Sequence, residues 1–126
     1  MATSLNAKIL IVEDERNIAR YIEESLESFG YSTIDTAVSA EEAIRKAKEM
    51  NPDVVLMDIA LNGPMDGIEA AEVIKEQLGT PLIYITAYSH DKIANRAKAT
   101  RPVGYLLKPF RMKDLQKGVE IALRQR

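Results

Sequence analysis

Short, almost continuous apolar runs alternate with amphipathic stretches along nearly the whole chain, and this alternation constrains the fold most strongly. The runs cover residues 9–12, 54–57, 82–85 and 103–107. Apolar character that continues over four or five residues is typical of strands buried on both faces of a parallel sheet. A fifth stretch, residues 32–36, has β-branched residues but is more polar, and it predicts an edge strand.

Five other stretches repeat apolar residues at three- and four-residue steps, as helices do. Two of them begin with capping signals, Ser39 followed by Glu42 and Asp66 followed by Glu69. The predicted helices cover residues 18–29, 39–50, 66–78, 89–100 and 114–124.

Strict alternation of strand and helix implies right-handed crossovers and a parallel sheet covered by helices on both faces. Five such units predict a flavodoxin-like, doubly wound α/β fold with strand order 2-1-3-4-5 and five helices. The 126 residues suit a single domain, residues 1–126, because they contain no linker, repeat or low-complexity tract.

The composition narrows the possible partners and compartment. Seventeen basic and nineteen acidic residues give a net charge of -2, which argues against nucleic acid as the main partner. The absence of cysteine excludes disulfides and thiolate metal sites. No stretch approaches the roughly 18 apolar residues of a membrane span, and the N-terminal MATSLNAK lacks the apolar segment of a signal peptide. We therefore expect a cytoplasmic protein without a membrane partner.

Charged and hydroxyl side chains stand where four of the predicted strands end. Glu13 and Asp14 follow the first strand, Asp58 the third, Thr86 the fourth and Lys108 the fifth. Because the carboxyl ends of parallel strands share one edge, where such sheets bind ligands, these side chains are expected to converge. Any one of them alone is more often a helix cap, a β-former or a surface residue. The combination at four strand ends indicates a chemical site.

Converging carboxylates repel one another and need a counter-charge. Mg2+ suits this role, because it binds carboxylates, water and phosphate oxygens and seldom needs a full protein cage. Such a cation together with Lys108 would make the site receptive to a phosphoryl group. Asp58 could then attack that group to form an aspartyl phosphate, and Thr86 could donate a hydrogen bond to one of its oxygens.

The stretches ILIVEDE, DVVLMDIAL, MDGIEA, PLIYITAY and GYLLKPF, in this order, resemble the receiver domains of two-component response regulators of the chemotaxis-regulator-like kind. The resemblance covers about residues 8–123. It implies a phosphoacceptor that takes its phosphoryl group from a sensor histidine kinase or a phosphotransfer protein. The domain would then change a protein-interaction surface seen by an output domain or a downstream protein. It would catalyse only its own phosphorylation and dephosphorylation, so we expect no enzyme with a separate substrate.

The resemblance also implies the metal site. Asp58 is the phosphoacceptor in this reading, and Glu13 and Asp14 are the acidic pair that holds Mg2+, with Asp14 as the more direct ligand. The third protein ligand is the backbone carbonyl two residues beyond the acceptor, that of Ala60.

The switch residues follow from the same resemblance. Thr86 is the switch hydroxyl, Tyr105 is the aromatic residue whose ring changes position, and Lys108 is the phosphate-binding cation. The Lys108–Pro109 peptide bond is cis in such domains, a form that only X-Pro bonds adopt at low cost.

The chain departs from the family pattern in two places. One extra residue lies between Asp58 and the MDG turn, within residues 62–64. Two residues beyond the acceptor and the switch hydroxyl stand Ala60 and Tyr88, which offer no group to orient an attacking water, so we predict a long-lived phosphoryl group. The single histidine, His90, is expected at a surface helix start without a chemical role, and the phosphoryl donor must therefore be external.

Three alternative functions fit the same fold class. A haloacid-dehalogenase-like phosphohydrolase would have a second aspartate two residues after the nucleophile, where this chain has Ala60. A flavin or nucleotide module would need a phosphate-binding loop after the first strand, where the charges of residues 13–15 would repel phosphate. A degenerate receiver would bind partners without phosphorylation, although every switch position is filled here. A stand-alone receiver and the receiver part of a longer protein both stay open.

Overall fold

The computed structural model of the chain describes residues 5–87 and 91–125, and it contains a five-stranded sheet with five helices. All strand pairs are parallel, and the strand order is β2-β1-β3-β4-β5. The strands are β1 (Lys8–Val12), β2 (Thr33–Ala37), β3 (Val54–Asp58), β4 (Leu82–Thr86) and β5 (Gly104–Leu107). The helices are α1 (Arg16–Ser28), α2 (Ala40–Met50), α3 (Gly67–Leu78), α4 (Asp91–Ala99) and α5 (Met112–Gln125). The predicted fold class and strand order are confirmed.

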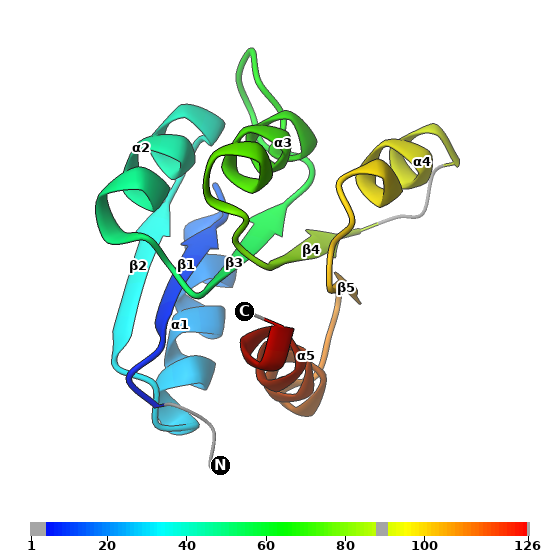
Figure 1. The fold of residues 1–126 in the computed structure, drawn as a ribbon. Coiled ribbons are helices and arrows are strands. Elements are labelled where there is room, and N and C mark those ends of the chain that lie inside the picture. Colours follow the sequence, from blue (N-terminus) through cyan, green and yellow to red (C-terminus); the bar gives the residue numbers. More distant parts are fainter. Residues whose placement is uncertain (1–4, 88–90, 126) are drawn as a thin grey trace.

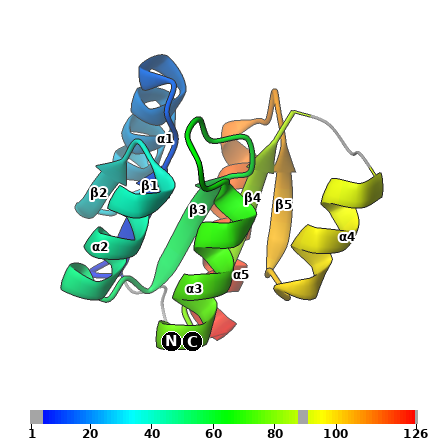
Figure 2. The same cartoon turned by 90° about the horizontal axis from the view of Figure 1, so that it is seen from above.

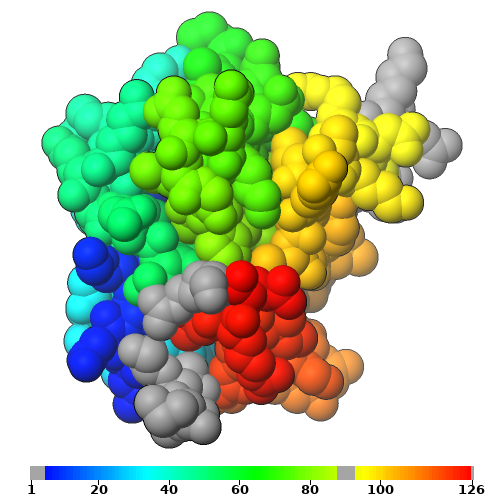
Figure 3. All heavy atoms as spheres, viewed as in Figure 1, coloured from blue at the N-terminus to red at the C-terminus, as the bar shows by residue number. Residues whose placement is uncertain are grey.

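Helices cover both faces of the sheet. α1 and α5 lie on one face, and α2, α3 and α4 lie on the other (Figures 1 and 2). In the space-filling view the side chains of α3 fill the space between those of α2 and α4 (Figure 3). The inner strands β1, β3 and β4 therefore have an apolar layer on each side, which explains why their sequences are continuously apolar, whereas the edge strands β2 and β5 are partly exposed.

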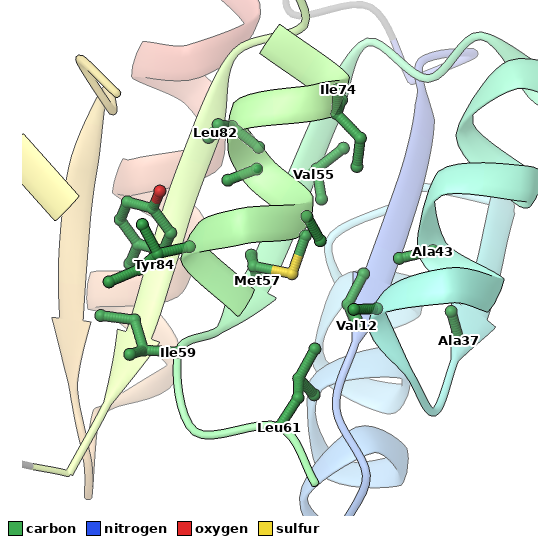
Figure 4. Packing of buried hydrophobic residues seen from close by; sticks show 14 of the residues in the cluster. Val12, Ala37, Ala43, Val55, Met57, Ile59, Leu61, Ile74, Leu82 and Tyr84 are labelled. Carbon is green, nitrogen blue, oxygen red and sulfur yellow. The ribbon is translucent and has the colours of Figure 1, made fainter. Parts of the chain in front are cut away.

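Two separate cores follow from this arrangement. Ile9, Ile11 and Leu56 point toward α1 and α5, where they pack with residues such as Leu26 and Leu115. The alternate strand positions point to the other face (Figure 4). There, Val12, Val55, Met57, Leu82 and Tyr84 pack against side chains that include Ala43 and Ile74. All residues of β3 and β4 are buried, so the last residues of these strands, Asp58 and Thr86, are held in fixed positions.

The capping signals predicted from the sequence begin their helices as expected. Ser39 accepts a hydrogen bond from the Glu42 amide at 3.1 Å, although the Glu42 carboxylate reaches back to the amide of Val38 rather than to that of Ser39. Asp66 and Glu69 form a full reciprocal capping box, with both hydrogen bonds at 2.9 Å.

The last helix begins earlier than the sequence suggested. α5 starts at Met112 rather than at Asp114, because Asp114 lies inside the first turn and its carboxylate accepts from the amide of Arg111 at 3.4 Å. An acidic residue in the first turn is favourable for the helix dipole, so the sequence alone did not distinguish this position from an N-cap. The predicted start of the fourth helix at residue 89 lies outside the described residues, and α4 is described from Asp91.

A buried hydrogen-bond chain ties the end of α4 to the sheet. The Thr100 hydroxyl donates to the Ala97 carbonyl at 2.6 Å. The Tyr84 hydroxyl lies 2.6 Å from Oγ1 of Thr100 and therefore acts as the donor to Thr100. Burial raises the pKa of Tyr84 to about 12, because its effect is larger than that of the Thr100 hydrogen bond, which lowers the pKa.

Of the helices in the described part of the chain, none is both long and apolar enough to cross a membrane.

Candidate functional site

The carboxyl ends of the strands bring the predicted site residues to one edge of the sheet. Val12 of β1 pairs with Met57 of β3, so Glu13 and Asp58 extend side by side. Asp58 pairs with Ile85 of β4, and Thr86 pairs with the last residue of β5, which precedes Lys108. The sheet register alone therefore places two carboxylates, one hydroxyl and one ammonium group along the same edge, and Asp14 follows Glu13 there.

Glu13, Asp14 and Asp58 form a tight acidic cluster. One carboxylate oxygen from each residue lies within 4.8 Å of the other two. Glu13 and Asp58 are almost completely buried, with 1% and 3% of their surfaces exposed, whereas Asp14 is half-buried. Three carboxylates at this separation and depth repel one another strongly unless a cation or a proton is shared among them.

Lys108 supplies part of the counter-charge. Its Nζ lies 3.1 Å from Oε1 of Glu13 and 3.7 Å from Oδ2 of Asp58. Backbone amides satisfy the opposite sides of the cluster, because Glu15 donates to Glu13, Ala60 to Asp58 and Asn62 to Asp14, each at 3.1 Å.

Oε1 of Glu13 depends on Lys108 alone. This oxygen is buried, lies 3.1 Å from the ammonium group of Lys108 and, among the described residues, is not reached by a backbone amide. One ammonium group therefore faces three clustered carboxylates. This donor set fits a hard divalent cation such as Mg2+.

The pKa values express the same crowding. Burial, together with the charge of Asp58, raises the pKa of Glu13 from 4.5 to about 7. For Lys108, burial lowers the pKa, but the carboxylates of Asp58 and Glu13 raise it more, so its pKa lies above the usual value. Without a further cation, the Glu13 carboxyl group therefore takes up a proton more readily than an ordinary glutamate.

Ala60 begins the loop that follows the acceptor. Its side chain is exposed, while its amide donates to Oδ1 of Asp58. The longer loop predicted at residues 62–64 brings the Asn62 amide back to Asp14. Sequence reasoning missed this contact, since backbone amides leave no residue-type signal.

Thr86 and Tyr105 face a common apolar cavity. Thr86 is buried at the end of β4, and its carbonyl accepts from the Lys108 amide at 2.8 Å. Tyr105 is 47% exposed, and its ring stacks on that of Tyr84 with centroids 6.0 Å apart and an interplanar angle of 28°. A cavity of about 230 Å³ lies between Thr86 and Tyr105, with Ile59, Ile93 and Ala97 among its walls.

The remaining predicted features divide into observed and undescribed ones. The Lys108–Pro109 peptide bond is cis. Tyr88 and His90 lie outside the described residues, so the predictions that rest on them, the long-lived phosphoryl group and the inert surface histidine, stay predictions.

The sequence also matches known proteins over most of its length. The family model of the response regulator receiver domain matches residues 9–120. The transcriptional regulatory protein PdtaR of Mycobacterium tuberculosis is 34% identical over 116 residues, which is 92% of this chain and 56% of that protein. The transcriptional regulatory protein YvrH of Bacillus subtilis is 37% identical over 120 residues, which is 95% of this chain and 50% of that protein.

Solved structures give the same result. The signal receiver domain of a modulated diguanylate cyclase from Desulfovibrio desulfuricans G20 matches with a TM-score of 0.90 and 37% identity, covering 95% of each chain. The chemotaxis protein CheY4 of Vibrio cholerae matches with a TM-score of 0.84 and 29% identity, covering 94% of this chain and 99% of that chain.

Fold and site thus define a phosphoacceptor signalling domain. The chain belongs to the response regulator receiver domain family of two-component systems. This membership removes the phosphohydrolase and the nucleotide module from the candidate functions. The chain spans about half the length of the curated relatives it matches.

Proposed function

We propose that Asp58 is the phosphoacceptor of this receiver domain and that Mg2+ is required for its phosphorylation. One observation carries the proposal. The buried Asp58 carboxylate shares a 4.8 Å cluster with Glu13 and Asp14 and has the ammonium group of Lys108 at 3.7 Å. Among the described residues, Glu13, Asp14 and Asp58 form a cluster of three side chains that could bind a metal ion together.

The carboxylates of Glu13, Asp14 and Asp58 and the carbonyl of Ala60 would hold the cation. When bound, Mg2+ would offset the carboxylate charge and that of the incoming phosphoryl oxygens. The charge of the cluster supports this assignment, because the single ammonium group of Lys108 does not balance three carboxylates.

The chemistry of the chain itself is a single displacement. An oxygen of Asp58 attacks phosphorus, and the bond from phosphorus to the leaving group breaks. The leaving group is the imidazole nitrogen of a phosphohistidine or, with acetyl phosphate, a carboxylate oxygen. Lys108 stabilises the negative charge on the phosphoryl oxygens. Water later cleaves the acyl phosphate, returning Asp58 and inorganic phosphate, so the domain acts only on itself.

The switch would use the cavity between Thr86 and Tyr105. Once Asp58 carries a phosphoryl group, the Thr86 hydroxyl can donate to one of its oxygens. The Tyr105 ring, half exposed and in contact with the cavity of about 230 Å³, can then turn inward. The surface around α4 and β5 would change with it, shifting an equilibrium between two states.

A sensor histidine kinase or a phosphotransfer protein is the proposed donor. A surface depression of about 570 Å³ beside Lys108 is lined by Ile18, Tyr21, Pro109 and Phe110. The rings of Tyr21 and Phe110 lie 6.0 Å apart, and Tyr21 is exposed. This apolar surface reaches Lys108, whose ammonium group lies 3.7 Å from the acceptor carboxylate, so we assign it to contact with the donor. The same proposal treats residues 1–126 as one domain and places it in the cytoplasm. It also includes an output domain or a downstream protein that responds to the domain.

The test compares wild type with Asp58→Asn, which keeps the shape and removes the charge. Both proteins are incubated with acetyl phosphate, with and without Mg2+, and their intact masses are measured. We expect the mass of one phosphoryl group on wild type in Mg2+ only, and none on Asp58→Asn. Asp35→Asn, which changes an exposed carboxylate of β2, serves as the control and is expected to behave as wild type. Phosphorylation of Asp58→Asn at the wild-type rate would contradict the assignment.

A further inference from the structure

Gly67, in the MDG stretch of the sequence, packs directly on the backbone of the acceptor. A Cβ atom added at Gly67 would lie 1.9 Å from the carbonyl oxygen of Asp58, 2.9 Å from its carbonyl carbon and 3.0 Å from the Cα of Ile59. Ordinary contact begins near 3.4 Å, so the nearest atom would have to move by about 1.5 Å. We propose that Gly67 is a positioning residue for phosphoryl transfer, because its missing side chain sets where Asp58 and the following peptides lie.

The peptide between Asp58 and Ile59 cannot yield freely. The Ile59 amide donates to Ile85 of β4 at 3.1 Å, and the Ile59 carbonyl accepts from Gly67 at 3.1 Å. The side chains of Ile59 and Leu61 are both buried in the core on the α3 face (Figure 4). All three atoms that a Cβ would meet belong to the backbone, so a change of rotamer does not relieve the overlap.

The start of α3 is equally restrained. Asp66 caps the helix through the reciprocal bonds with Glu69, and its carboxylate also pairs with Arg96 of α4 at 3.0 Å. Ile68 and Ala71 of the first turns are fully buried. A side chain at position 67 would therefore strain both partners. Residues 60 and 62–64 of the loop after the acceptor are exposed, so this loop is the part that can shift.

That loop carries the atoms on which the proposed site depends. The Ala60 amide holds Oδ1 of Asp58, and the Asn62 amide holds Oδ2 of Asp14, each at 3.1 Å. A misplacement of about 1 Å near reacting groups costs up to roughly a hundredfold in rate. This inference rests on the proposed role of Asp58, but its metal-binding part does not require phosphorylation.

The test uses Gly67→Ala with two matched variants. Gly118→Ala makes the same chemical change in α5, where the added Cβ would lie an ordinary 3.5 Å from Ile83. Ile74→Val weakens the buried face of α3 without touching the acceptor backbone. For each protein, Mg2+ affinity is measured by calorimetry without phosphodonor. The phosphorylation rate is measured at saturating Mg2+ and acetyl phosphate, and the melting temperature is measured in EDTA.

We expect Gly67→Ala to weaken Mg2+ binding by about tenfold or more and to slow phosphorylation at saturation by about ten- to a hundredfold. Gly118→Ala and Ile74→Val should have a Mg2+ affinity and a phosphorylation rate within about twofold of wild type. Ile74→Val should nevertheless melt at a lower temperature. If Gly67→Ala only melts earlier, like Ile74→Val, or does not fold at all, Gly67 has a folding role and the positioning role is overturned. If wild type binds Mg2+ but is not phosphorylated, the proposed function fails while the effect of Gly67→Ala on Mg2+ affinity still decides this inference.

Discussion

The Nζ atom of Lys108 lies 3.1 Å from Oε1 of Glu13 and 3.7 Å from Oδ2 of Asp58, so one ammonium group faces two buried carboxylates. With Asp14 in the same cluster, one positive charge stands against three negative ones. The site is therefore arranged for a further cation, and Lys108 is left able to turn toward a phosphoryl group on Asp58.

Lys108→Met separates these two roles. The variant removes the ammonium group but keeps most of the side-chain volume, so we expect Mg2+ to bind at least as tightly as in wild type, since a competing positive charge is lost. Phosphorylation by acetyl phosphate should slow by about tenfold or more, because charge on the phosphoryl oxygens loses a fixed partner. Calorimetry and intact mass against time measure the two effects. Lys46→Met, which breaks the ion pair between Lys46 of α2 and Asp35 of β2, is the control. An unchanged phosphorylation rate in Lys108→Met would refute this role.

The raised pKa of Glu13 should make the free energy of unfolding fall as the pH rises toward neutral. Its pKa is raised from 4.5 to about 7 in the folded protein, so folding favours the protonated form. The stabilisation is complete below pH 4.5 and is lost as the pH rises through about 7. In EDTA, Glu13→Gln should therefore lose less unfolding free energy than wild type between pH 5 and pH 8, by about 1 to 3 kcal/mol.

Urea unfolding at both pH values measures this difference. Because the comparison is between two proteins, groups that titrate in both cancel. Saturating Mg2+ should recover stability in wild type at pH 8 more than at pH 5, since the cation competes with the proton for Glu13. Parallel pH profiles for the two proteins in EDTA would show that Glu13 does not carry the shift.

Thr86 should couple phosphorylation to the ring of Tyr105. Beryllium fluoride in Mg2+ mimics the phosphoryl group on Asp58, and in wild type we expect it to shift the ring resonances of Tyr105 in a carbon–proton NMR spectrum. In Thr86→Ala the adduct should still form, while the Tyr105 shift becomes much smaller, because no hydroxyl moves toward the added oxygens. Thr33→Ala on the exposed edge strand is the matched control. A full Tyr105 response in Thr86→Ala would mean that the two residues are not coupled.

Tyr21 separates the donor surface from the chemistry. Tyr21→Ala should slow phosphoryl transfer from a phosphorylated histidine phosphotransfer protein by about tenfold, since an exposed aromatic residue in an apolar interface is often a dominant contact. The rate with acetyl phosphate should be unchanged, because the ring of Tyr21 packs near Phe110 and Tyr21 is not part of the acidic cluster. Ile121→Ala, at an exposed apolar residue of α5, is the control. Equal slowing with both donors would assign Tyr21 to the site rather than to the partner.

Much of this arrangement could be predicted from the sequence. Continuous apolar runs fixed the buried strands, and strand ends located Glu13, Asp58, Thr86 and Lys108, since parallel strands necessarily share an edge. The features that could not be predicted from the sequence are contacts made by backbone atoms. The hydrogen bond from Asn62 to Asp14 and the approach of Gly67 to Asp58 involve no side chain whose type announces them. The start of α5 was misplaced because an acidic residue serves both as a cap and within the first turn.

Mapping the phosphorylated residue tests the central claim most directly. After incubation with acetyl phosphate and Mg2+, borohydride reduction converts an aspartyl phosphate to homoserine, which tandem mass spectrometry locates in the peptide that contains residues 54–67. The account predicts homoserine at position 58 and at no other acidic residue, and none when Mg2+ is withheld. Homoserine at position 14, or a label that forms equally well in EDTA, would contradict it.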